Sequence, residues 1–330
     1  MSRRVILALL LAVTGTAGAL SPAAGEIYRL GILQPSQPAA MWRSAPQMRS
    51  FLEGLQQLGY VEGQNLVIDF RSAESEIERL PGLAAELVAL KVDVLWVATC
   101  GAPLAAAMRA TATIPIVVAA CSDDMVAAGI VQSLARPGGN VTGIQKLTPE
   151  LAAKRLELLK EVSPKASRVA ILWDPAYSDF AADWARLRAS ARSLGVTLLP
   201  VEAKDPTEFE SSFSTMIALR ADALITFSDA VTYVHRQRLA DLAFQHRLAM
   251  ITPFQETTAA GGLISYGPSI PDTTHHSAVF IDRILKGTKA GDVPIEQPTK
   301  FDLVINLKTA KALGLTLPQS LLLRADEVIH

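Results

Sequence analysis

The sequence has few of the residues and motifs that enzymes use for catalysis. Its 330 residues include only two cysteines and five histidines, which leaves little material for a metal centre or a thiol nucleophile. The sequence contains no G-x-G-x-x-G after the first predicted strand, no G-x-x-x-x-G-K-[ST] and no G-x-S-x-G. These absences argue against a dinucleotide-dependent enzyme, a P-loop nucleotidase and an α/β-hydrolase.

An excess of either charge is also absent. Lys and Arg number 31 against 32 Asp and Glu, so the formal net charge is −1. Such a chain lacks the basic surface typical of nucleic-acid binding, and we expect no nucleic-acid partner. Hydrophobic residues make up 50% of the sequence, which is ample for a buried core without a disulfide framework.

A long uncharged apolar run occurs only at the N-terminus. Arg3 and Arg4 precede the apolar stretch Val5–Val13, and small residues follow it. This order predicts a secretory signal peptide within residues 1–25, cleaved after Ala19 or near Ala24. A retained membrane anchor is the alternative, although the run is short for a membrane span. The first cysteine is Cys100, so we expect an exported protein without a lipid anchor.

The rest of the chain alternates short apolar strands with amphipathic helices in two successive sets. The first set predicts strands at 28–33, 66–70, 92–98 and 114–120, and the second at 168–173, 196–201, 222–227, 249–252 and 263–266. Helices between the strands imply parallel pairing through right-handed crossovers. The predicted fold class is therefore α/β, with two doubly wound Rossmann-like lobes.

Glycine, proline and capping residues mark the connections. The segment 136–143 holds three glycines and a proline and is interpreted as a turn that feeds a crossing between the lobes. Thr148 and Pro149 are predicted to open a helix, and Asp205 and Glu208 to form a capping box before another. Single helices are predicted over 231–246 and 273–285, and the tail adds a strand at 301–305 and a helix at 307–313.

Polar and aromatic residues gather at the carboxyl ends of the predicted strands, where open α/β sheets bind their ligands. Helix capping is the alternative role for the aspartates among them, and core packing is the alternative for Trp173 and Phe227. No catalytic or metal-binding set emerges. The candidate ligand-binding residues are Gln34, Ser36, Thr99, Cys100, Gly101, Cys121, Ser122, Asp123, Trp173, Asp174, Tyr177, Phe227, Ser228, Asp229, Gln255, Glu256 and Tyr266.

The two cysteines follow consecutive strands that we expect to be neighbours in the sheet. Cys100 and Cys121 therefore either form a disulfide at the rim of the cleft or remain as two reduced thiols.

Four stretches of the sequence closely resemble the ABC-transporter substrate-binding proteins of the tryptophan-binding-like type. The resemblance runs from about Tyr28 to the last residues, and the C-terminal stretch is the most specific. These stretches are LGYVEGQN at 58–65, ARPGGNVTG at 135–143, GGLISYG at 261–267 and QPTKFDLVINLKTAKALGL at 297–315.

The resemblance implies a type I periplasmic-binding-protein fold with a hinge, a cleft between the lobes and three crossing strands. By similarity, residues 27–144 and 269–300 would form the first lobe, and residues 145–268 and 301–330 the second. Thr99 and Ser122 would hold a ligand carboxylate, while Asp229 or Glu256 would hold an amino group.

The resemblance further implies a non-enzymatic periplasmic component of an ABC importer. Its ligand would be a small solute, such as an aromatic amino acid or a related aromatic or zwitterionic compound, and its partner the permease in the inner membrane. We expect a monomer without a cofactor. A ligand-sensing module for a receptor is the first alternative, and an exported enzyme with Asp123 and Asp229 as an acid/base pair is the second.

Overall fold

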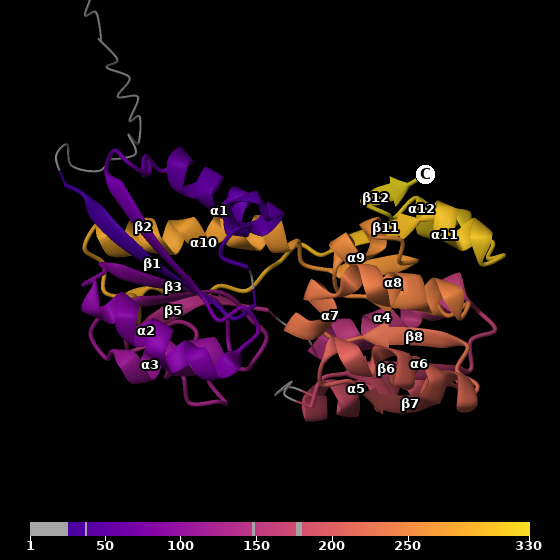
Figure 1. The fold of residues 1–330 in the computed structure, drawn as a ribbon. Coiled ribbons are helices and arrows are strands. Elements are labelled where there is room, and N and C mark those ends of the chain that lie inside the picture. The colour runs from indigo at the N-terminus through magenta and orange to yellow at the C-terminus, as the bar shows by residue number, and fades with distance from the viewer. Residues whose placement is uncertain (1–25, 37, 147–148, 176–179) are drawn as a thin grey trace, which may run out of the picture.

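The computed structural model describes residues 26–36, 38–146, 149–175 and 180–330. It contains two β-sheets, each with helices on both faces (Figure 1). The predicted signal peptide, Thr148 and Tyr177 lie outside the described residues.

The first lobe is built on a parallel five-stranded sheet of order β2-β1-β3-β4-β5. One face of the sheet packs Phe51, Trp96 and Phe280 into a core, while the other packs Leu87 and Leu104. The strands are β1 (Tyr28–Gln34), β2 (Leu66–Ser72), β3 (Val94–Thr99), β4 (Ile116–Cys121) and β5 (Val141–Gln145), and the helices are α1 (Pro46–Gln57), α2 (Leu80–Ala89), α3 (Ala102–Ala110) and α10 (Ile270–Leu285).

Helix α10 comes from the C-terminal part of the chain and returns to the first lobe. Figure 1 shows it in orange beside α1, among indigo and purple elements. Two buried hydrogen bonds fix it there: Trp96 Nε1 donates to Ser277 Oγ at 2.8 Å, and the Tyr60 hydroxyl donates to Asp282 at 3.1 Å. The first lobe therefore depends on residues more than 180 positions apart.

The second lobe is built on a seven-stranded sheet of order β12-β11-β10-β9-β8-β6-β7. Only β10 and β11 pair antiparallel among the described strands. The strands are β6 (Arg168–Trp173), β7 (Thr197–Glu202), β8 (Ala223–Thr226), β9 (Ala249–Thr252), β10 (Ile264–Gly267), β11 (Asp302–Asn306) and β12 (Glu327–Ile329). The helices are α4 (Pro149–Val162), α5 (Phe180–Ser193), α6 (Phe209–Ala218), α7 (Ala230–Val234), α8 (Arg236–Gln245), α9 (Gln255–Ala259), α11 (Leu307–Ala312) and α12 (Gln319–Leu322).

The segment interpreted as a turn ends in a strand, β5. The sequence does not predict this strand, because Gly143 interrupts the run of β-branched and apolar residues that is typical of a strand. Its φ is +136°, and a β-carbon there would lie 2.1 Å from the Val118 carbonyl oxygen. Glycine is thus required where β5 meets an irregularity in β4. The helix predicted over 231–246 is also interrupted, since α7 ends before His235 and α8 begins after it.

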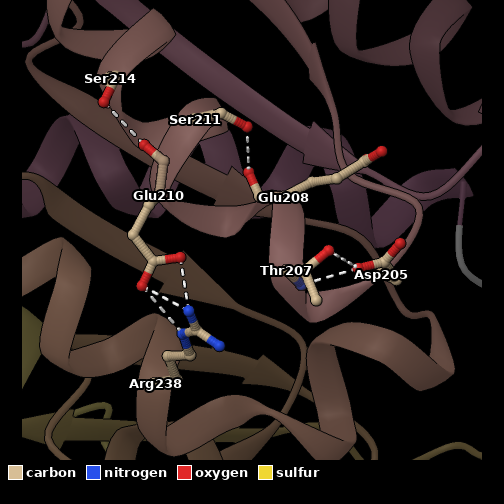
Figure 2. A network of polar contacts seen from close by, with 7 residues as sticks. All are labelled: Asp205, Thr207, Glu208, Glu210, Ser211, Ser214 and Arg238. Carbon is tan, nitrogen blue, oxygen red and sulfur yellow. Dashed lines mark hydrogen bonds and ion pairs between the residues drawn. The ribbon is translucent and has the colours of Figure 1, made fainter.

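The predicted capping box before α6 forms in a modified way (Figure 2). Asp205 accepts from the Thr207 N–H at 2.7 Å, and the Glu208 carboxylate accepts from the Lys204 N–H at 2.8 Å. The side chains therefore satisfy backbone donors at the helix start, one residue away from the usual partners. Beyond the cap, Glu210 pairs with Arg238 and links α6 to α8.

Candidate functional site: a cleft between the lobes

A cleft lies where the carboxyl ends of the strands of the two lobes meet. Its empty volume is about 750 Å³, including space open to solvent. The first lobe lines it with Gln34, Pro35, Ser36, Gln47, Trp96, Ala98, Thr99, Ala120, Ser122, Ile270 and Thr274, the second lobe with Ser228, Asp229, Tyr233, Val234 and Phe254, and the connection after β5 with Lys146.

Six of the predicted ligand-binding residues line this cleft. They come from the ends of four strands, β1, β3, β4 and β8, and the turns after them, which is where the strand-end rule places a ligand site. Their contacts with a ligand stay a prediction. They are Gln34, Ser36, Thr99, Ser122, Ser228 and Asp229.

Four further candidates of the first lobe, Cys100, Gly101, Cys121 and Asp123, are not among the residues that line the cleft. Cys100 and Cys121 form a disulfide, which resolves the alternative that the sequence left open. Their sulfur atoms are therefore not free to bind a metal with the neighbouring Asp123. Gly101 is exposed and caps the start of α3 with a φ of +73°. The disulfide joins the two turns that carry Thr99 and Ser122.

The aromatic candidates of the second lobe contact other aromatic rings, Trp173 and Phe227 that of Phe180 and Tyr266 that of Phe301. The Trp173 and Phe180 rings stack with centroids 3.6 Å apart, and the fully buried Phe227 meets Phe180 edge-on. The Tyr266 carbonyl oxygen accepts from the buried Arg155 Nε at 2.8 Å. These rings do not line the cleft, and neither do Asp174, Gln255 and Glu256; their role in ligand binding stays a prediction.

Sequence inspection did not single out several residues that do line the cleft. Gln47 and Thr274 lie on helices α1 and α10, away from any strand end. Tyr233 lies on α7, and Lys146 follows β5, the strand that the glycine pattern concealed. Phe254 belongs to the strand-end segment that supplied the candidates Gln255 and Glu256. A search of the turns after every strand, β5 included, would have found Lys146.

Asp229 is a buried carboxyl group with an unused hydrogen-bond acceptor. It caps α7, where its Oδ1 accepts from the Thr232 N–H at 2.7 Å. Its Oδ2 is buried without a hydrogen-bond partner, and the residue is only 8% exposed. Burial raises the pKa of Asp229 to about 7; the nearby Asp174 carboxylate contributes to the rise, and the hydrogen bonds with Thr232 oppose it. A cationic group in the cleft would restore the ionised form.

Lys146 is a buried cationic group on the same cleft. Its Nζ donates to Ser228 Oγ at 3.1 Å, and its backbone N–H donates to the Cys121 carbonyl oxygen at 2.6 Å. Burial lowers the pKa of Lys146 to about 8, and the buried Arg155 acts in the same direction. The carboxylates of Asp123, Asp229 and Glu256 oppose that shift.

Tyr233 connects the two walls of the cleft. Its hydroxyl donates to Gln47 Oε1 of the first lobe at 3.4 Å, and its ring meets Phe254 edge-on with centroids 4.9 Å apart. Burial, together with the Glu256 carboxylate, raises the pKa of Tyr233 above its ordinary value. Both Glu256 oxygens are buried without a hydrogen-bond partner, and burial raises the pKa of that carboxyl as well.

The cleft thus combines opposite charges, polar amides and hydroxyls, and the rings of Tyr233, Phe254 and Trp96. The two lobes together have the fold of the type I periplasmic-binding proteins. The sequence profile of the ABC transporter substrate-binding proteins matches residues 44–329. The chain belongs to that family.

The relatives agree with this assignment. A curated tyrosine-binding protein of Clostridioides difficile is 25% identical over 81% of this chain and 76% of its own length. A Streptococcus pneumoniae ABC domain solved in complex with L-Trp is 25% identical, covers 92% of this chain and 100% of its own, and aligns with a TM-score of 0.83. A ligand-free, open substrate-binding protein with adhesive properties from Clostridium difficile is 24% identical over 92% and 99% of the two chains, with a TM-score of 0.67.

Within the residues that the structure describes, no helix is both long enough and apolar enough to cross a membrane.

Proposed function

We propose that this protein is the periplasmic solute-binding component of an ABC importer and that it captures an aromatic amino acid or a related zwitterion. The observation that carries the proposal is the pair of buried, incompletely partnered charges on one cleft, Lys146 and Asp229. A zwitterionic solute would offer a countercharge to each. The aromatic side chains of the cleft would cover its apolar part.

The ligand class draws support from the relatives. One is a curated tyrosine-binding protein, and another was solved with L-Trp. Asp229 would hold the ligand's ammonium group through the unpartnered Oδ2. The role is one of binding without turnover, and no cofactor is required.

The mechanism would be closure of the lobes around the solute. We propose that residues 27–144 with 269–300 move as one body, and residues 145–268 with 301–330 as the other. The overall arrangement aligns better with the L-Trp complex than with the open, ligand-free relative, at nearly equal identity. This supports a closed conformation here, with Tyr233 and Gln47 in contact across the cleft. The permease in the inner membrane would recognise that closed form, which the ligand stabilises by its higher affinity for it.

Export through the N-terminal signal peptide within residues 1–25 and release as a monomer complete the proposal. Native mass spectrometry of gently purified mature protein tests for a co-purifying solute. A thermal-shift screen of amino acids, aromatic acids and amines then tests the ligand class, since ligand at a hundredfold excess over Kd adds about 2.7 kcal/mol to stability. Small-angle scattering should show compaction with the same solute. Absence of a shift with every aromatic amino acid would overturn the proposed ligand class.

A further inference from the structure

Lys146 lies at the junction of the two lobes. Its backbone N–H donates a hydrogen bond to the Cys121 carbonyl oxygen at the end of β4 in the first lobe. Its Nζ donates to the Ser228 hydroxyl after β8 in the second lobe. It also lines the cleft. A group bound to the Lys146 ammonium would therefore lie beside both lobes and the connection between them.

The Lys146 ammonium has an incomplete set of partners. The residue is only 7% exposed, and an ammonium group has three N–H donors. Among the residues that the structure describes, Nζ contacts only the neutral Ser228 hydroxyl, and no carboxylate of these residues is within ion-pair distance of it. The charged groups that face it are Asp123, Asp229, Glu256 and Arg155. Buried charges in proteins are ordinarily paired. The Lys146 ammonium departs from this rule, because none of these carboxylates contacts it directly.

The contact with Ser228 does not by itself require a charge. A glutamine amide at position 146 would supply a donor to the same hydroxyl without the cost of burying an ammonium group. The hydrogen bond with Ser228 thus does not explain why a positive charge is buried at position 146. An anionic partner in the cleft would explain it.

We propose that Lys146 binds a carboxylate of the solute and thereby restricts the cleft to ligands that carry an acid group; this inference rests on the function proposed above. The ligand carboxylate would take the two N–H donors that Ser228 leaves, while Asp229 takes the ligand's amino group. Lys146 thus acts as a specificity-determining residue that discriminates an amino acid from the corresponding amine.

The test compares L-tyrosine and L-tryptophan with tyramine and tryptamine by isothermal titration calorimetry. The wild type should prefer each amino acid over its amine by ten- to a hundredfold, as expected for one charge-assisted contact. Lys146→Gln should lose ten- to a hundredfold in affinity for the amino acids and less than threefold for the amines. Lys146→Arg should retain most of the preference, because the charge remains.

Lys154→Gln is the matched control, since it removes the same charge from a partly exposed position on α4, where Lys154 pairs with Glu157. It should change no affinity. Equal losses for amino acids and amines in Lys146→Gln would assign Lys146 a merely structural role and overturn the inference. Unchanged affinity for the amino acids would overturn it as well, with the proposed function left intact. Failure of the wild type to bind any of the four probes would instead overturn the proposed ligand class and this inference with it.

The wild type offers a second measurement that does not depend on how the variants fold. The preference for amino acid over amine should decline as the pH rises through about 8, because the Lys146 ammonium then loses its proton. A preference that stays constant as the pH rises from 7 to 8.5, before the amino groups of the ligands themselves lose their protons, would overturn the inference.

Discussion

Gly54 of α1 lies directly against the backbone of His275 in α10. A β-carbon at position 54 would be 2.6 Å from the His275 carbonyl oxygen and 3.1 Å from the Ala278 side chain. The close approach of the two helices therefore depends on the missing side chain. Gly54→Ala should lower the free energy of unfolding by about 1–3 kcal/mol, since the helices must separate to admit the methyl group. Urea denaturation measures the change.

Gly82 of α2 provides the matched control for this substitution. It is also a helical glycine, but it is exposed, and a β-carbon there would meet no atom within 4 Å. Gly82→Ala should therefore stabilise the protein by about 0.5–1 kcal/mol through helix propensity alone. Equal effects of the two substitutions would contradict the close contact between α1 and α10.

The protonation of Asp229 should make stability depend on pH. Burial raises the pKa of Asp229 in the folded state to about 7, above its ordinary value of 3.8. Between these values the folded state holds a proton that the unfolded state has released. The stabilisation is thus complete below the lower pKa and is lost as the pH rises through 7. The charged groups that face Asp229 are Lys146 and Asp174.

Asp229→Asn removes this titration, and its amide oxygen retains an acceptor for the cap of α7. The variant should gain stability relative to the wild type as the pH rises from 5 to 8, by on the order of 3 kcal/mol. Denaturation midpoints of both proteins across this range provide the measurement. A stability difference that does not vary with pH would mean that Asp229 titrates at its ordinary pKa.

The Cys100–Cys121 disulfide closes a short loop, whose ends are 21 positions apart in the sequence. Loop-closure entropy predicts that it stabilises the folded state by about 3 kcal/mol. The double variant Cys100→Ser with Cys121→Ser should lose that amount, and wild-type protein in reductant should match the variant. The variant itself should be insensitive to reductant. Thiol counting verifies that the disulfide is reduced. If the reduced wild type is then as stable as the oxidised protein, the disulfide has no stabilising role.

The alternation of strands and helices predicted the α/β class and most strand positions, because period and turn residues are local signals. The parts that eluded sequence inspection depend on contacts between distant segments. The β5 strand needed glycine where it meets Val118, and β12 is too short to show a pattern. The return of α10 to the first lobe came from the family resemblance and not from its residues.

The same distinction holds for the cleft. Thr99, Ser122 and Asp229 lie at strand ends, and the order of strands and helices is sufficient to predict a ligand site there. Gln47 and Thr274 enter from helices that meet only in the folded protein, where the Thr274 hydroxyl donates to the Gln47 carbonyl oxygen at 2.8 Å. Their place on the cleft depends on tertiary packing, which no local pattern encodes.

The return of α10 also constrains the order in which the protein can be assembled. The first lobe buries Trp96 against Ser277 and Tyr60 against Asp282, so its core stays incomplete until the chain has passed through β6 to β10. During synthesis or translocation from the N-terminus, strands β1 to β5 emerge before α10. The apolar surface that α10 covers therefore stays exposed until α10 has emerged. Contacts of such long sequence separation also slow folding. A chaperone that shields the partly made first lobe would act in that interval, before the ligand cleft exists.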